Sequence, residues 1–148
     1  NKFQKKYPIA QNAIQLQQGT VMDLYPTILS VAHVKSPKHY VLDGADLKKL
    51  LQGKEDKNHR DDFLMHFPHG EHRANYFTTY RKGDWKLIYY YNPETTGIPT
   101  WKLYNLKDDP YETSELSAKY PEKTASMIEL MKNRLTEENA LYPITENK

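Results

Sequence analysis

Four short segments in which apolar and polar side chains alternate limit the fold of this chain more than any other feature. They are Phe63–Phe67, Tyr76–Arg81, Trp85–Tyr91 and Trp101–Leu106. Such alternation is typical of β-strands that place one face on a core. The second and third segments are joined by Lys82-Gly83-Asp84, which contains the glycine that a tight hairpin turn favours. Four successive strands with short connections predict an antiparallel meander.

A helix is predicted after these strands, between residues 118 and 138. Pro121 lies in its first turn, where a missing N–H costs little. Apolar side chains recur at helical spacing along it: Met127, Met131 and Leu135. We expect this helix to cover one face of the sheet, which makes the fold class α+β. Because strand 85–91 is apolar or aromatic on both faces, we expect its other face to be buried against a second domain.

Residues 1–54 have weaker patterns, and two short helices are predicted in them. One runs from about Leu24 to His33, and Asp23 can accept hydrogen bonds from the amides of its first turn. The other has one or two turns ending near Leu51, with Gly53 placed to end it in the left-handed conformation. The apolar side chains of these helices have no partner sheet in the segment.

The segment Lys54–Asp62 is nearly all charged and offers nothing to bury, so it marks the predicted boundary. We expect two parts, residues 1–54 and residues 55–148. A self-sufficient first part would bury its apolar side chains, whereas a piece of a larger domain would expose them. We expect exposure at four positions: Leu24, Ile28, Leu47 and Leu50.

Composition excludes several classes of function. With 21 basic and 19 acidic residues, the formal charge of +2 is too balanced to indicate a nucleic-acid or anionic-membrane partner. The absence of cysteine excludes disulfides, thiolate zinc sites and a cysteine nucleophile in these 148 residues. No apolar run approaches the roughly 18 to 20 residues that cross a bilayer. The chain begins at Asn1, which a processed product or a fragment would both explain.

A histidine cluster is the clearest candidate site. Its members are His59, His66, His69 and His72, within fourteen residues. A metal site is disfavoured, because Pro68 and Gly70 oppose the helix on which that spacing would align ligands. On a loop, His69, His72 and Arg73 could instead bind sulfate, phosphate or sugar hydroxyls. A polar surface loop is the third interpretation, and spacing alone favours it.

The sequence alone offers no nucleophile. It contains no glycine-rich phosphate loop, no Gly-x-Ser-x-Gly elbow and no convincing pair of carboxylates. Two further interpretations therefore stay open: a free-standing carbohydrate- or anion-binding module that uses the aromatic sheet and the histidine loop, and a purely structural interaction domain.

Five blocks in a fixed order resemble a known family. They are VMDLYPTILSVAHV, LDGADLKKLLQGK, FLMHFPHGEH, TTYRKGDWKLIYYY and KLYNLKDDPYETSELSAKYPE. Together, over about Val21 to Leu135, they resemble the C-terminal third of a type I, formylglycine-dependent sulfatase, and most closely the bacterial polysaccharide and glycosaminoglycan sulfatases. Any one block is weak evidence, but their shared order is specific.

The resemblance implies an alkaline-phosphatase-like enzyme, in which residues 1–54 close a large α/β domain and residues 55–148 form a smaller sheet-and-helix subdomain. Such enzymes hydrolyse sulfate esters with a formylglycine made from Cys or Ser in a C/S-x-P/A-x-R motif, beside calcium held by Asp and Asn. That motif is absent here, and Ser36-Pro37-Lys38 has the wrong spacing. Formylglycine and calcium would therefore belong to an N-terminal sulfatase domain as partner, and the chain alone would be inactive.

The resemblance also gives the histidine segment a role. His66, Phe67, Pro68 and His69 match an H-aromatic-P-H segment near the substrate cleft of the family. It implies that a sulfated carbohydrate substrate is contacted by four residues of this chain: His66, His69, His72 and Arg73. No catalytic or metal-binding residue is expected in the chain, and the parent enzyme would be periplasmic or secreted.

Overall fold

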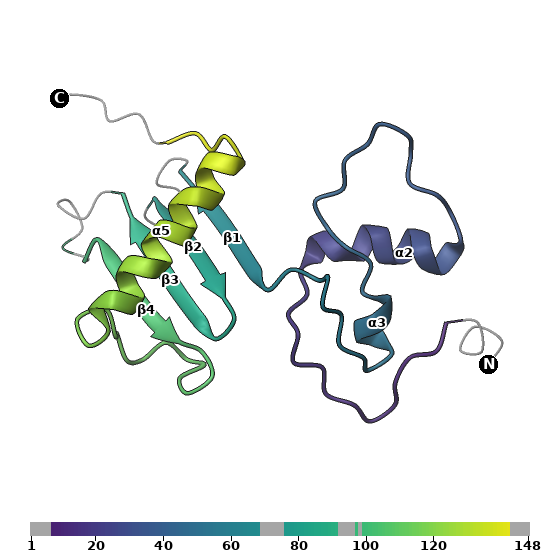
Figure 1. The fold of residues 1–148 in the computed structure, drawn as a ribbon, viewed down its shortest axis with the longest axis horizontal. Coiled ribbons are helices and arrows are strands. Elements are labelled where there is room, and N and C mark those ends of the chain that lie inside the picture. The colour runs from purple at the N-terminus through teal and green to yellow at the C-terminus, as the bar shows by residue number, and fades with distance from the viewer. Residues whose placement is uncertain (1–6, 69–75, 92–96, 98, 143–148) are drawn as a thin grey trace. The chain divides into compact units, whose positions relative to one another are not determined.

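The computed structural model describes residues 7–68, 76–91, 97 and 99–142. The chain divides into two compact units, Asn1–Asp61 (unit 1) and Asp62–Lys148 (unit 2). Figure 1 shows the helices and strands of each unit. None of the helices in the described ranges is both long enough and apolar enough to cross a membrane.

Unit 2 contains the predicted antiparallel meander. Its strands are β1 (Asp62–Phe67), β2 (Phe77–Lys82), β3 (Trp85–Tyr90) and β4 (Trp101–Asn105), in the spatial order β1-β2-β3-β4. Each neighbouring pair is antiparallel. Lys82 pairs with Trp85 around a two-residue turn, in which Gly83 has a positive φ of 56°. The sheet, its order and the hairpin glycine were all predicted from the sequence, and the structure confirms them.

Helix α5 (Pro121–Glu137) crosses one face of this sheet (Figure 1). The register aligns Tyr80, Leu87 and Leu103 across three neighbouring strands. The apolar stripe of α5 packs on them, and all six side chains are at most 2% exposed: Tyr80, Leu87, Leu103, Met127, Met131 and Leu135. Each such burial contributes about 1.5–3 kcal/mol. The predicted helix and its three core positions are confirmed.

The β4 edge of the sheet is covered by the chain, whereas the face opposite α5 is open among the described residues. Along β4, the Glu115 carboxylate accepts a hydrogen bond from the Leu103 amide (2.9 Å), and the Leu116 amide donates to the Leu103 carbonyl (2.9 Å). The segment after β4 thereby covers that edge strand, which limits edge-to-edge pairing. The sheet face opposite α5 has no such cover among the described residues. It forms an apolar groove of about 590 Å³.

Unit 1 contains a 3₁₀ turn (Val21–Asp23), helix α2 (Leu24–Ala32) and helix α3 (Lys48–Leu51). Both predicted helices are present. Beyond the end of α3, Gly53 has a positive φ of 72°. The amides of Gly53 and Lys54 donate to the carbonyls of Leu50 and Lys49, both at 2.9 Å. This is the Schellman arrangement, which satisfies the last carbonyls of a helix and favours glycine.

The predicted role of Asp23 as a cap of α2 is wrong. Its carboxylate accepts hydrogen bonds from the Thr20 amide (2.7 Å), the Thr20 hydroxyl (3.1 Å) and the Ala45 amide (2.8 Å). Asp23 is fully buried. Asp23 therefore connects the start of the helical region to a loop 22 residues further on. It does not accept hydrogen bonds from the first-turn amides of α2.

Unit 1 exposes part of its apolar surface. Leu24 and Ile28 are 55% and 62% exposed, as expected for a piece of a larger domain. Leu47 is half-buried, and Leu50 is only 6% exposed, so the same expectation is wrong for Leu50. Residues 7–18 run beside α3, where the Ala10 amide donates to the Leu51 carbonyl (2.8 Å), and Tyr7 in this segment is also buried.

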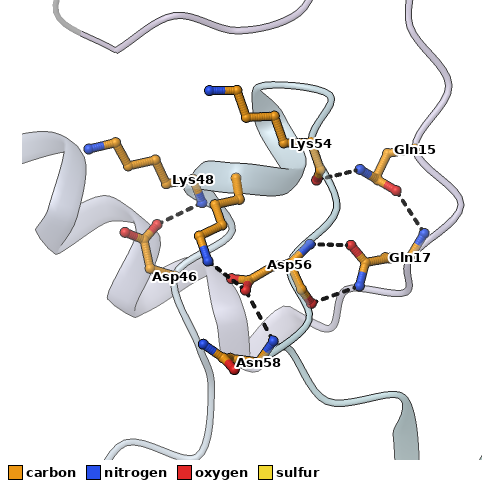
Figure 2. A network of polar contacts seen from close by, with 8 residues as sticks. Gln15, Gln17, Asp46, Lys48, Lys54, Asp56 and Asn58 are labelled. Carbon is orange, nitrogen blue, oxygen red and sulfur yellow. Dashed lines mark hydrogen bonds and ion pairs between the residues drawn. The ribbon is translucent and has the colours of Figure 1, made fainter.

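Glutamine side chains join residues 7–18 to the charged segment that follows α3 (Figure 2). Gln17 donates to the Asp56 carbonyl (2.9 Å) and accepts from the Asp56 amide (2.7 Å). Lys49 pairs with the Asp56 carboxylate at 2.8 Å. The imidazole of His59 is buried and bonds to the Gln18 carbonyl (2.8 Å). These contacts lie within unit 1, which extends to Asp61.

Candidate functional site

The His66 side chain lies on β1, on the same sheet face as the α5 core. Its Nδ1 lies 2.7 Å from the Thr78 hydroxyl, and its Nε2 lies 2.6 Å from the Leu141 carbonyl oxygen. The Thr78 hydroxyl is in turn 2.7 Å from the Tyr91 hydroxyl. We call His66, Thr78, Tyr91 and Leu141 the His66 network. It connects three strands or strand ends to the segment that follows α5.

The hydrogen-bond directions in this network follow from the Leu141 carbonyl, which can only accept. A carbonyl only accepts, so Nε2 of His66 carries the proton and donates to Leu141. In the neutral imidazole, Nδ1 then accepts from the Thr78 hydroxyl, which accepts from Tyr91. Burial raises the pKa of Tyr91, which keeps that hydroxyl protonated as a donor. Edge-on ring contacts at 6.0 Å between centroids join His66 to Tyr91 and to Tyr142.

The network marks one end of the sheet. In an antiparallel meander, the β1–β2 and β3–β4 connections leave from the same end, and His66 and Tyr91 stand just before these two connections. His69, His72 and Arg73, which were predicted to contact a ligand, follow β1 in the first connection and lie outside the described residues. The structure therefore places only His66 of the four predicted site residues. Both of its ring nitrogens have partners within the chain.

The described residues do not fit the cofactors of formylglycine-dependent sulfatases. Nowhere in the ranges 7–68, 76–91 and 99–142 do three His, Cys, Asp or Glu side chains gather closely enough to hold a metal ion. The sequence has no cysteine, and none of its serines is followed by the x-P/A-x-R pattern. We therefore assign no calcium ligand among the described residues, and the 148-residue sequence supplies no formylglycine motif.

Comparison with known proteins decides the family. The family model described as N-sulphoglucosamine sulphohydrolase, C-terminal, matches residues 2–140. This chain belongs to that family. A sulfatase of Formosa agariphila is 33% identical in an alignment 146 positions long, which covers 88% of this chain and 25% of the relative. The chain thus spans about a quarter of the length of the curated relatives that it matches.

Solved structures in this sulfatase group share the fold. BT4656, solved in complex with its substrate D-glucosamine-2-N,6-O-disulfate, is 29% identical with a TM-score of 0.60, over 77% of this chain and 23% of its own. BT1596, a 2-O GAG sulfatase, is 23% identical with a TM-score of 0.62, over 79% of this chain and 24% of its own. At 23% identity, the similarity to BT1596 shows only that the two chains share a fold. The predicted resemblance and fold class are thereby confirmed.

Three partners in the His66 network were not predicted from the sequence: Thr78, Tyr91 and Leu141. Strand alternation could have identified Thr78, because it pairs directly with His66 on the neighbouring strand. Leu141 lies 75 residues beyond His66, and it contributes a carbonyl group rather than a side chain. No sequence pattern marks a main-chain acceptor at that distance.

Proposed function

We propose that this chain is the C-terminal portion of a sulfatase that hydrolyses sulfate esters on a sulfated sugar or glycosaminoglycan. The family match over residues 2–140 carries the proposal. The likeness to BT4656, whose printed substrate is a disulfated glucosamine, supports a sulfated sugar as the substrate class. In this division of labour, formylglycine and calcium belong to a preceding domain, and the parent enzyme is periplasmic or secreted.

We further propose that residues 1–54 are the closing elements of the large α/β domain. The support comes from one stripe of unit 1. Val21, Leu24 and Ile28 recur at helical spacing and are 81%, 55% and 62% exposed. A contiguous exposed apolar stripe marks a contact surface. A free-standing binding module, the alternative, would have to keep this stripe in water.

We assign one wall of the substrate-binding cleft to the residues that follow β1 in the sequence. His69, His72 and Arg73 would contact the sulfated sugar, because histidine and arginine N–H groups suit sulfate oxygens and hydroxyls. His66 would bound the cleft by holding the end of β1, since its nitrogens already serve Thr78 and Leu141.

The structural role of His66 and the ligand-binding role of Arg73 predict different effects of substitution on stability and on KM. His66→Ala removes two hydrogen bonds and should destabilise the 148-residue chain by about 2 kcal/mol, at about 1 kcal/mol for each bond. Thermal unfolding without any ligand measures this loss, and Tyr91→Phe, which removes one hydroxyl, should give about half of it. Arg73→Ala should leave the unfolding temperature unchanged and raise KM of the longer enzyme. A stable His66→Ala chain would contradict the bounding role.

Sulfate release tests the proposed function. The 148-residue chain should release no sulfate from an aryl sulfate or from a sulfated glucosamine, because it holds no formylglycine motif. The longer protein, with its preceding domain, should release sulfate, and replacing its motif Cys or Ser by Ala should abolish turnover. Turnover by the 148-residue chain would overturn the assignment. A longer protein that binds sulfated sugars without turnover would favour the binding module.

A further inference from the structure

The chain has a defined conformation where it leaves α5. Asn139 has a positive φ of 51°. The Asn139 amide donates to the Thr136 carbonyl (3.1 Å), and the Ala140 amide donates to the Leu135 carbonyl (2.9 Å). This is again the Schellman arrangement, in which glycine or asparagine takes the left-handed position. Ala140 also packs against the core of unit 2, so the residues that follow leave the helix in a fixed direction.

The ring of Tyr142 is held by neighbouring rings and is still open to solvent. The carbonyl of Leu141, the residue before it, accepts the hydrogen bond from His66 (2.6 Å). The Tyr142 ring meets the rings of His66 and Tyr91 at centroid distances of 6.0 and 6.2 Å, with interplanar angles of 71° and 68°. The residue is nevertheless 55% exposed. Burial therefore does not account for the position of this ring, and its exposed surface is available to a ligand.

Further ring contacts connect Tyr142 to the core of unit 2. Tyr91 meets Tyr89 edge-on at 4.6 Å, and Tyr89 lies against Trp101 at 4.4 Å, with ring planes 31° apart. Tyr89 and Trp101 both pack on the core. Because a side chain that is already held loses little conformational entropy on binding, the Tyr142 ring is preorganised for a ligand.

We propose that Tyr142 determines specificity by stacking on a sugar ring of the substrate, next to the sulfated unit. This inference rests on the proposed function, which assigns a wall of the substrate-binding cleft to the residues that follow β1. His66 and Tyr91, which both contact Tyr142, stand just before the two connections that leave this end of the sheet. The negative face of an aromatic ring attracts the polarised C–H bonds on the apolar face of a pyranose.

The sulfate group itself is a poorer ligand for Tyr142. The negative face of the ring repels an anion, and the phenol hydroxyl is uncharged and donates a single hydrogen bond. Tyr142 is therefore suited to a neutral sugar surface rather than to sulfate. Its contribution should appear only with substrates that extend beyond the sulfated unit.

Kinetics with substrates of two lengths test this inference in the longer protein. The probes are D-glucosamine-2-N,6-O-disulfate, the printed substrate of BT4656, and a heparin tetrasaccharide that ends in the same unit. Tyr142→Ala should raise KM for the tetrasaccharide about fivefold more than KM for the monosaccharide. Tyr142→Phe keeps the ring and should restore most of this loss. Tyr111→Ala, at a tyrosine that is 86% exposed, is the matched control and should change neither KM.

A thiol at position 142 reports whether this surface is open and what covers it. The 148-residue sequence has no cysteine, so mass spectrometry of the peptide that carries Tyr142→Cys measures its modification alone. In the longer protein, N-ethylmaleimide should modify this thiol at a rate similar to that of Tyr111→Cys. The tetrasaccharide, at about ten times its dissociation constant, should slow modification at position 142 by about tenfold. The monosaccharide should not slow it.

Equal changes in KM for the two probes in Tyr142→Ala, with a lower unfolding temperature, would show that the ring is only structural and would overturn the inference. Slow modification at position 142 without added sugar would show that protein covers the ring, which also overturns it. Sulfate release separates this inference from the proposed function. Release from both probes without protection by the tetrasaccharide contradicts the stacking alone, and protection without release contradicts the activity alone.

Discussion

Gly44→Ala is expected to disrupt unit 1 while unit 2 stays folded. A Cβ added at Gly44 would stand inside van der Waals contact of the Met22 carbonyl group and 2.7 Å from the Asp23 nitrogen. Both neighbours are backbone atoms, which cannot turn away as a flexible side chain can. The loop must therefore move off the 3₁₀ turn, at a cost of about 3 kcal/mol or more.

The movement would also break the bonds that this contact supports. The Ala45 amide, next to Gly44, donates to Asp23, and the Leu47 amide donates to the Thr27 hydroxyl (2.9 Å). Hydrogen exchange of these two amides should lose its protection in Gly44→Ala. Both tryptophans of the chain lie in unit 2, so their fluorescence should stay native.

Gly19→Ala is the matched control for this substitution. A Cβ at Gly19 would meet the Leu47 side chain at 3.4 Å, an ordinary contact, and Gly19 is not among the glycines with a positive φ. Its amide protection pattern should match that of the unsubstituted chain. If Gly44→Ala also kept the protection of Ala45 and Leu47, the close approach would not be a constraint on unit 1.

The features that were predicted correctly depend on neighbours in the sequence. Strand alternation fixes which side chains of β2, β3 and β4 face α5, and the period of α5 fixes which of its side chains meet them. Gly53 and Gly83 were identified because a helix end and a two-residue hairpin each require a positive φ, which glycine adopts without strain. Sheet order followed from short connections alone.

The features that were missed depend on contacts between distant segments. Asp43-Gly44 is a dipeptide typical of turns, but the φ of Gly44 is not in the left-handed range, and the constraint on Gly44 comes from the Met22 backbone. The charged run 54–62 looked solvated, yet its His59 is buried beside Gln18, 41 residues earlier. Composition and periodicity contain no information about such pairings, because many loops could supply the same amides and carbonyls.

The candidate site also has a part that the sequence predicted and a part that only the structure shows. The residue types in the histidine segment predicted donors for an anionic sugar, and resemblance to a family supplied the context. The structure shows that both ring nitrogens of His66 form hydrogen bonds within the chain, which the sequence could not reveal. The sequence could therefore identify which ligands the side chains of a loop are able to bind. It could not identify which of those side chains already form hydrogen bonds within the chain.

Asp23→Asn is expected to destabilise unit 1 by about 2 kcal/mol or more and to remove part of its sensitivity to acid. The carboxylate receives bonds from Thr20 on one oxygen and from Ala45 on the other. An asparagine must present its NH₂ group to one of these donors, which leaves a buried N–H without an acceptor. The exchange protection of the Ala45 amide at neutral pH measures the loss.

The sign of the pH effect follows from the pKa of Asp23. Burial raises this pKa, but the hydrogen bonds from Ala45 and Thr20, with the nearby His59, lower it by more, so it lies below its ordinary value. A carboxyl whose folded pKa is depressed stabilises the fold above its unfolded pKa of about 3.9 and loses that contribution as pH falls further. Unit 1 of the unsubstituted chain should therefore weaken below about pH 4.

The substituted chains separate this carboxyl from the others. In Asp23→Asn, the stability of unit 1 should start lower at neutral pH and fall less steeply through the acid range, because the buried carboxyl of Asp23 is no longer there to titrate. Asp43→Asn makes the same chemical change at an exposed position of the same unit and should reproduce the unsubstituted profile. Parallel acid profiles for Asp23→Asn and the unsubstituted chain would show that Asp23 contributes nothing through its charge. The Ala45 contact would then be an ordinary neutral hydrogen bond, with no part in how the helical region is held to its loop as the pH falls.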